Sequence, residues 1–452
     1  VAASKPNETN IKSVLAREVL DSRGKPTVEV EVSCGAAVGR AIVPSGASTG
    51  RFEACELRDE TSDRYGGQGV QQAVANANEV LAREVVALDA ADQQALDRKL
   101  IECDGTADKS RLGANAILGV SLAAAHAAAV ARGVPLVRHL NDLWAEVIAQ
   151  GDEPTAVGRE MSMPLPMVNM ISGGLHAGGQ LDFQDYLILP VGASSYSESL
   201  EWIVDVYRVL GDLLREAGHE GYLVGDEGGY GPRLPDNESA LTFLMQAVEK
   251  AGYQAGDEIA IGLDVASTHF YRDGTYHLQS ERGTALSAKE LTQRFVEWCD
   301  RYPIVSIEDG LAEDDWAGWK ELTDALGERV QLLGDDLFTT NVSRVDEGIS
   351  RGVANSVLIK LNQVGTLWET LQAICVSRQA GYRPVVSARS GETEDSTIAD
   401  LAVATGAGQI KIGSIARSER LAKYNQLLRL EERLGGDAPF AGGGIVRPIA
   451  GR

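Results

Sequence analysis

Three acidic residues in the second half of the chain each follow an apolar, β-rich run, where they could share a metal ion. Asp264 ends IGLD, Glu308 ends VSIE and Asp335 follows LLG. The carboxyl ends of neighbouring barrel strands meet at one mouth, and three hard oxygen ligands there would suit Mg²⁺. The alternative is that each acid only caps the next helix, which is easier to accept for one such residue than for three.

Two lysines lie in similar apolar runs and could supply a base and a cationic contact. Lys360 lies in SVLIKLNQ and Lys411 in GQIKIGS. A lysine that faces a barrel mouth near a metal is expected to have a lowered pKa, which allows it to accept a proton. The alternative is a lysine that extends along apolar surface towards water.

Polar, glycine-rich loops supply the remaining candidates. GDEGGY places Glu227 on a loop that can approach a ligand closely, and ISGGLHAGG does the same for His176, a candidate catalytic residue. SARSGETED places Arg389 and Ser390 directly after a strand-like run, which suits a phosphate or carboxylate clamp. The alternatives are an ordinary turn at Glu227 and a structural ion pair between Arg389 and a glutamate of its own loop.

The elements that must position these residues form two predicted domains. Period-two alternation over residues 13–43 predicts an antiparallel sheet, and residues 69–134 have helical spacing, so residues 1–145 are predicted to be an α+β capping domain. Residues 146–452 alternate strand-like runs with helical stretches and are predicted to form an α/β barrel of the TIM type. Two of these runs are expected to close at Asp185 and at Asp226-Glu227. A doubly wound open sheet is the alternative, but no GxGxxG follows an early strand.

Composition excludes several classes of function. The chain has 452 residues, 44% of them hydrophobic, which is enough for a large core, and its net charge is −23. That charge repels phosphate backbones and anionic lipids, so neither nucleic acid nor membrane is an expected partner. Five scattered cysteines without CxxC spacing favour a reducing, cytoplasmic location. The uncharged stretch 114–131 is predicted to be a buried helix.

With these segments assembled, the chain resembles enolases over nearly its whole length. The resemblance implies an N-terminal domain with a mobile loop, an enolase-type barrel whose first units are atypical, and a homodimer or a larger assembly of dimers. The strings that carry it are DSRGKPTVEVEV, PSGASTG, GANAILGVSL, GDEGGY, IVSIEDGL, GDDLF, LIKLNQ, RSGETED, IADLAV, GQIK and RLAKYNQLLRLEE.

The resemblance also implies two Mg²⁺ ions and a phosphorylated small-molecule substrate. Asp264, Glu308 and Asp335 resemble the ligands of the first ion, and Ser48 resembles a ligand of the second, which assembles with the substrate. The two cations would stabilise the dianionic ene-diolate that forms when a proton is removed next to a carboxylate.

Roles in the reaction follow from the same resemblance. Lys360 resembles the base that removes the C2 proton of 2-phosphoglycerate, and Glu227 the acid that assists departure of the C3 hydroxyl. Lys411 resembles the contact to the substrate carboxylate, and Arg389 and Ser390 resemble the phosphate-binding residues. A base of the lysine type with Mg²⁺ is the general arrangement of the enolase superfamily.

Three positions depart from the enolase pattern. Ala388 stands where enolases have an active-site histidine, and Gln184-Asp185-Tyr186 stands in place of Gln-Glu-Phe, so the second carboxylate of the acid pair is one methylene shorter. Thr268-His269-Phe270 replaces Ser-Glu-Phe. Losing one positioned proton-transfer group commonly costs about 10²–10⁴ in rate.

We therefore expect a diverged enolase paralogue that binds 2-phosphoglycerate or phosphoenolpyruvate, together with a second, phosphonate substrate in the room left by Ala388. One alternative is an ordinary enolase in which His269 supplies the missing imidazole. Another is a non-catalytic binding protein, which would have no reason to retain Lys360, Glu227 and three metal carboxylates.

Overall fold

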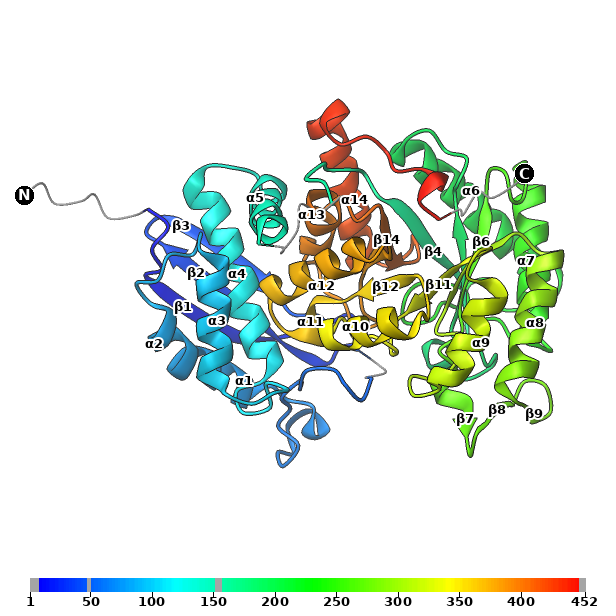
Figure 1. Cartoon of the computed structure of the whole chain (residues 1–452), viewed down its shortest axis with the longest axis horizontal. Helices are drawn as coiled ribbons and strands as arrows, with labels where there is room; N and C mark the ends of the chain where they lie inside the picture. The colour runs from blue at the N-terminus through cyan, green and yellow to red at the C-terminus, as the bar shows by residue number, and fades with distance from the viewer. Residues whose placement is uncertain (1–7, 47–49, 151–156, 447–452) are drawn as a thin grey trace, which may run out of the picture.

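A three-stranded antiparallel sheet covered by helices forms the N-terminal part of the protein. The computed structural model describes residues 8–46, 50–150 and 157–446. The sheet has the order β1-β2-β3, which confirms the prediction for residues 13–43, and the helices pack on one of its faces (Figure 1). The elements are β1 (Ser13–Leu20), β2 (Pro26–Cys34), β3 (Ala37–Ile42), α1 (Gln71–Ala75), α2 (Ala82–Val85), α3 (Gln93–Asp104), α4 (Ala114–Arg132) and α5 (Leu136–Ala149).

Helix α4 packs so tightly on this sheet that the residues at the contact must be small. A Cβ atom at Gly39 would lie only 2.1 Å from the backbone nitrogen of Ala127, so only glycine fits there. Among the described residues, α4 is the one helix long and apolar enough to cross a membrane, but 83% of its apolar window is buried inside the protein. The helix is therefore a core element, as predicted.

Eight strands close into a barrel in the C-terminal part, in the order β10-β11-β12-β13-β14-β4-β5-β6. Polar residues lie at the end of the barrel where most strands finish. The strands are β4 (Leu165–Ser172), β5 (Asp185–Leu189), β6 (Ala260–Asp264), β10 (Ile304–Glu308), β11 (Gln331–Gly334), β12 (Ser356–Ile359), β13 (Arg383–Ser387) and β14 (Gln409–Gly413).

Strand β5 runs antiparallel to both of its neighbours, so the barrel is not uniformly parallel. The connection from β4 holds only a short 3₁₀ turn, η3 (Gly174–His176), and a parallel return needs a longer crossover. Asp185 therefore begins a strand, whereas the sequence pattern placed it at the end of one. Because β5 is reversed, Asp185 still pairs in register with Asp264 at the functional mouth.

Helices surround the barrel, and the strand-like run expected before Glu227 is instead a loop. An excursion after Asp264 forms a small sheet of β7 (Tyr271–Arg272), β8 (Thr275–Leu278) and β9 (Thr284–Leu286). The helices are α6 (Tyr196–Glu216), α7 (Asn237–Lys250), α8 (Ala288–Arg301), α9 (Trp316–Leu326), α10 (Val342–Arg351), α11 (Leu361–Val364), α12 (Leu367–Gln379), α13 (Thr397–Ala404) and α14 (Ser418–Leu434).

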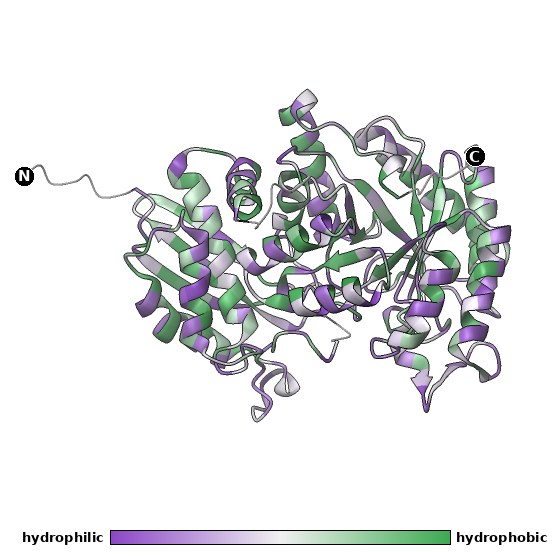
Figure 2. Cartoon of the chain, in the orientation of Figure 1, coloured by the Kyte–Doolittle hydropathy of each residue, from purple (hydrophilic) through white to green (hydrophobic). Residues whose placement is uncertain are grey.

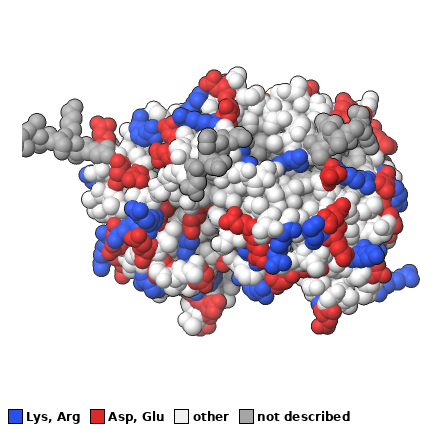
Figure 3. Space-filling view, viewed as in Figure 1, with Lys and Arg blue, Asp and Glu red and all other residues white. Residues whose placement is uncertain are grey.

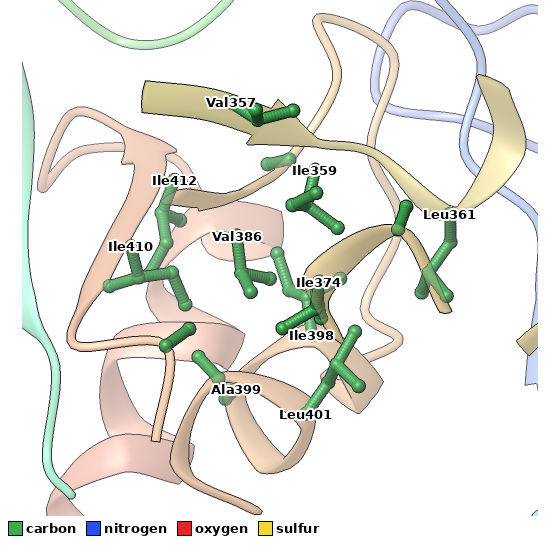
Figure 4. Packing of buried hydrophobic residues seen from close by; sticks show 14 of the residues in the cluster. Val357, Ile359, Leu361, Ile374, Val386, Ile398, Ala399, Leu401, Ile410 and Ile412 are labelled. Atoms are coloured by element: carbon green, nitrogen blue, oxygen red, sulfur yellow. The ribbon is translucent and has the colours of Figure 1, made fainter. Parts of the chain in front are cut away.

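The layer between strands and helices is apolar and fixes the strand ends in place. Figure 2 shows apolar residues along the strands and polar residues on outward helix faces. In Figure 4, Val386 and Ile410 of the barrel lie near Ile398 of α13, and all three are buried. Figure 3 shows acidic and basic side chains interspersed over the described residues of one face. Because this core is packed and apolar, the residues that could take part in chemistry are expected on the loops at the barrel mouth.

Candidate active site

Lys411 lies at the centre of the barrel mouth, between two of the predicted metal ligands. Its Nζ donates to Asp264 Oδ2 and to both carboxylate oxygens of Glu308, each at 2.7 Å. Asp264 and Glu308 end adjacent strands in matching register, which explains why both reach the same ammonium. Burial lowers the pKa of Lys411, but the carboxylates of Asp264 and Glu308 outweigh burial and raise it well above its ordinary value. Lys411 is therefore a fixed positive charge.

Lys360 is paired with the third predicted ligand. Its Nζ makes a close ion pair with Asp335 Oδ2, and Asp335 Oδ1 accepts a hydrogen bond of 2.8 Å from Gln363. Burial lowers the pKa of Lys360, but the carboxylate of Asp335 outweighs it, so the pKa is raised. The expectation of a lowered pKa is wrong for this arrangement, because the sequence did not reveal the direct carboxylate partner.

The residues present fit a divalent cation. Two lysine ammonium groups form ion pairs with three buried carboxylates at the barrel mouth, so the mouth already binds positive charge. Carboxylate oxygens are also the ligands that Mg²⁺ prefers. Among the described residues, two groups of acidic and histidine side chains have ligand atoms within 4.8 Å of one another. One group is His176, Asp185 and Glu227, and the other is Asp309, Asp335 and Asp336. Asp264 and Glu308 belong to neither group because Lys411 lies between them. Ser48 lies outside the described residues.

Addition of Mg²⁺ is expected to raise the thermal unfolding midpoint, and above the Kd the rise should grow with the logarithm of the Mg²⁺ concentration. A ligand that binds only the folded state at about 100 times its Kd stabilises by roughly 2.7 kcal/mol. Glu308→Gln removes a buried charge at the mouth, so it should abolish most of this rise, as measured by differential scanning fluorimetry. Glu297→Gln, on the exposed side of α8, is the control. An undiminished rise in Glu308→Gln would refute the assignment of Glu308 as a ligand.

The predicted phosphate-binding arginine is tied to the N-terminal part of the chain. Arg389 Nη1 and Nη2 lie 3.0 and 3.2 Å from the two carboxylate oxygens of Glu53. Nη1 also donates to Asn362 Oδ1 at 2.9 Å. The guanidinium therefore pairs with a distant glutamate and not with one of its own loop, where Glu392 is paired with Lys423. An anionic ligand would compete with Glu53 for Arg389.

A second group of titratable residues lies near Lys411 at the same barrel mouth. His176 Nδ1 lies 2.9 Å from Asp185 Oδ2, and His176 Nε2 lies 3.9 Å from Glu227 Oε1. Burial raises the pKa of Glu227, but the positive charges of His176, Arg420 and Lys411 outweigh it and lower the pKa. Glu227 is therefore ionised at neutral pH beside a basic histidine.

One small polar cavity connects these groups. Predicted residues line it from several strands, and Ala388 contributes its methyl group to the wall. Asp185, Glu308 and Asp335 do not line it, and neither does His269, which is exposed on a 3₁₀ turn after β6. The lining residues are His176, Gln184, Glu227, Asp264, Lys360, Ser387, Ala388, Arg389, Ser390 and Lys411.

Arg420 was missed by the sequence analysis although it supports the whole site. Its guanidinium is fully buried and donates to the backbone oxygens of Arg389, Ser390 and Ile412 at 2.6, 2.7 and 2.9 Å. It comes from α14, inside a string used above only for resemblance. The signal that could have identified it is an arginine on the apolar side of an amphipathic helix, which requires buried acceptors.

Arg420→Met is expected to destabilise the barrel and to reduce binding of an anionic substrate. Leaving a buried acceptor unsatisfied costs about 1–3 kcal/mol, and three carbonyls lose a donor here. Urea unfolding followed by tryptophan fluorescence should show a loss of at least about 2 kcal/mol. Arg429→Met, at an exposed position of the same helix, should lose little. Equal stability of the two variants would contradict the supporting role of Arg420.

Comparison with known families matches the chain to two family models. The first is described as "Enolase, N-terminal domain" and matches residues 11–140. The second is described as "Enolase, C-terminal TIM barrel domain" and matches residues 160–449. The second match alone covers more than half of the chain, and it contains every candidate residue described above except Glu53 and Ser48.

Proposed function

Since the chain belongs to the enolase family, we propose that it is a Mg²⁺-dependent, diverged paralogue that acts on 2-phosphoglycerate or phosphoenolpyruvate with altered chemistry. The specific reaction that we propose is that of a carboxyphosphonoenolpyruvate synthase. Such an enolase relative builds an enolpyruvate that carries a phosphonoformyl group, in the biosynthesis of phosphinate natural products. A second substrate, an activated phosphonoformate, is part of this proposal.

The observation that carries the proposal is Ala388 in the cavity wall. Ala388 lines the same cavity as the candidate base Lys360 and the candidate phosphate contacts Arg389 and Ser390. A methyl group in place of an imidazole removes a proton-transfer group and leaves room next to the phosphorus-binding side. His269 does not line this cavity, which favours a site that lacks the imidazole over one in which His269 supplies it.

Different residues of the chain have different roles in the proposed reaction. Lys360 removes the C2 proton, which requires that Asp335 exchange its contact with Lys360 for one with a cation. Lys411 contacts the substrate carboxylate, and Arg389 and Ser390 hold the phosphorus-bearing group. Two Mg²⁺ ions, when bound by Asp264, Glu308, Asp335 and Ser48, would supply stabilisation of the negative charge that develops on the carboxylate.

The test is turnover of 2-phosphoglycerate by metal-stripped protein reloaded with Mg²⁺, followed by the ultraviolet absorbance of phosphoenolpyruvate. We expect little or no turnover but intact, Mg²⁺-dependent binding of 2-phosphoglycerate by calorimetry. Addition of activated phosphonoformate should then give the phosphonoformyl enolpyruvate, detected by ³¹P NMR. In this reaction C3 loses water, the activating group leaves the phosphonoformyl phosphorus, and the phosphoryl group of 2-phosphoglycerate passes to water and appears as inorganic phosphate. Turnover at ordinary enolase rates would overturn the proposal and establish a hydratase, whereas binding without any reaction would favour a non-catalytic protein.

We also propose that the protein is a homodimer or an assembly of dimers in the cytoplasm. Large apolar side chains are exposed on the N-terminal sheet, where Leu15, Leu20 and Val38 are each about half accessible. A second copy of the chain is the partner that the family resemblance suggests for this surface. Light scattering at several protein concentrations tests the assembly size.

A further inference from the structure

Asp185 has no free oxygen with which to act on a substrate. It is fully buried at the start of β5 and does not line the cavity. Its Oδ1 accepts a close hydrogen bond from Asn169 Nδ2 and one of 3.2 Å from Ser172 Oγ. Its Oδ2 is 2.9 Å from His176 Nδ1. Both oxygens of this carboxylate are therefore occupied by protein partners, and one of them contacts His176.

The contact with Asp185 fixes which nitrogen of His176 faces the ligand. With Nδ1–H donated to the carboxylate, Nε2 is the nitrogen left for the cavity, 3.9 Å from Glu227 Oε1. One ligand hydroxyl can contact both groups at that separation, because it can accept from Nε2–H and donate to the Glu227 carboxylate. The backbone holds the ring in place as well, because Asp226 N–H donates to the carbonyl of His176 at 3.2 Å.

The surroundings favour a positively charged ring. Burial lowers the pKa of His176, but the charges of Asp185 and Glu227 outweigh it and raise the pKa to about 9. Ala388 offers no side-chain donor to the cavity. The remaining cationic groups of the lining are each committed to a carboxylate, Lys411 to Asp264 and Glu308, Lys360 to Asp335 and Arg389 to Glu53.

We propose that Asp185 is a positioning residue that holds the His176 ring so that Nε2–H faces the cavity and donates a hydrogen bond to an oxygen of the bound substrate. The identity of the ligand depends on the function proposed above. The coupling between Asp185 and His176 does not depend on that function.

A double-mutant cycle separates positioning from direct contact. We expect Asp185→Asn to weaken binding of 2-phosphoglycerate with Mg²⁺ about tenfold, which is typical for loss of a charge-assisted hydrogen bond. In a His176→Gln background the same change should alter the Kd less than twofold, because its target is gone. In a His269→Gln background, the matched control, the tenfold loss should persist. Isothermal titration calorimetry measures the Kd values of all six proteins.

Two outcomes overturn the inference, and both are distinct from failure of the proposed function. Additive losses in the His176→Gln background would mean that Asp185 acts on the ligand directly. In the free protein, ¹⁵N-labelled histidine should give a hydrogen-bonded Nδ1–H resonance for His176 that disappears in Asp185→Asn. An unchanged resonance would refute the coupling even if 2-phosphoglycerate fails to bind, which would itself overturn only the proposed substrate.

A second variant tests the same proposal if Asp185→Asn fails to fold. Ser172→Ala removes one of the hydrogen bonds to Asp185 Oδ1 and leaves the carboxylate and the cavity lining intact. We expect it to weaken binding by about two- to fourfold, and this loss should also vanish in the His176→Gln background. A loss that persists there would again contradict the positioning role.

Discussion

Lys360→Ala should reduce exchange of the C2 proton of 2-phosphoglycerate with solvent to the background level. A positioned general base contributes about 10²–10⁴ in rate, so the fall should be at least that large. The Lys360 side chain lines the cavity, and its ion pair with Asp335 directs it from the end of β12. Proton NMR in D₂O follows the exchange directly and does not require turnover to a product.

The matched control is Lys320→Ala, which removes an exposed lysine paired with Asp324 on α9. It should leave exchange unchanged. Persistence of exchange at the normal rate in Lys360→Ala would refute the assignment of Lys360 as the base. A loss of exchange accompanied by lost 2-phosphoglycerate binding would instead assign Lys360 to binding, so calorimetry must accompany the NMR measurement.

The sequence could predict that the site residues come together at one mouth, because the same local pattern, an apolar run that ends in an acidic residue, recurs along the chain. Asp264 and Glu308 each end a short apolar run, and strand ends of a barrel meet at one mouth. The structure places the two residues in matching register on adjacent strands. Eight of the eleven predicted site residues that the structure describes line one cavity, and Lys411 connects Glu308 to it.

Strand direction could not be predicted, because alternation and apolar content are the same for both directions. Asp185 was placed at the end of a strand and begins one instead. A strand-like run was expected to close at Asp226-Glu227, but the residues that lead up to Glu227 form a loop, held by a backbone hydrogen bond between Ser414 N–H and the Glu227 carbonyl. Both residues still reach the mouth, because the reversed β5 and this loop return the chain to the same end.

The charge partners could not be predicted either, because they depend on contacts between residues far apart in the sequence. Arg389 pairs with Glu53 from the N-terminal part of the chain, and Arg420 reaches the loop after β13 and the loop that holds Asp226. The raised pKa of Lys360 has the same origin, since burial alone would lower it and the carboxylate of Asp335 reverses the direction.

Ala388→His combined with Asp185→Glu should raise turnover of 2-phosphoglycerate to phosphoenolpyruvate, by up to about 10²-fold. The histidine returns an imidazole to the cavity wall, and the longer carboxylate can extend past the hydrogen bonds that now hold Asp185. Steady-state absorbance assays at saturating Mg²⁺ measure the gain. The single variants separate the two contributions.

Most of the gain should come from Ala388→His, because Ala388 lines the cavity and Asp185 does not. Asp185→Glu alone should lower ligand affinity, since the His176 ring then loses its present contact. The same Ala388→His change should reduce any reaction with activated phosphonoformate, because the imidazole fills the room that the second substrate needs. A gain in hydratase turnover without that loss would mean that the second substrate does not occupy the space beside residue 388. No gain in either double or single variants would mean that the surrounding backbone, and not the missing imidazole, limits the enolase reaction.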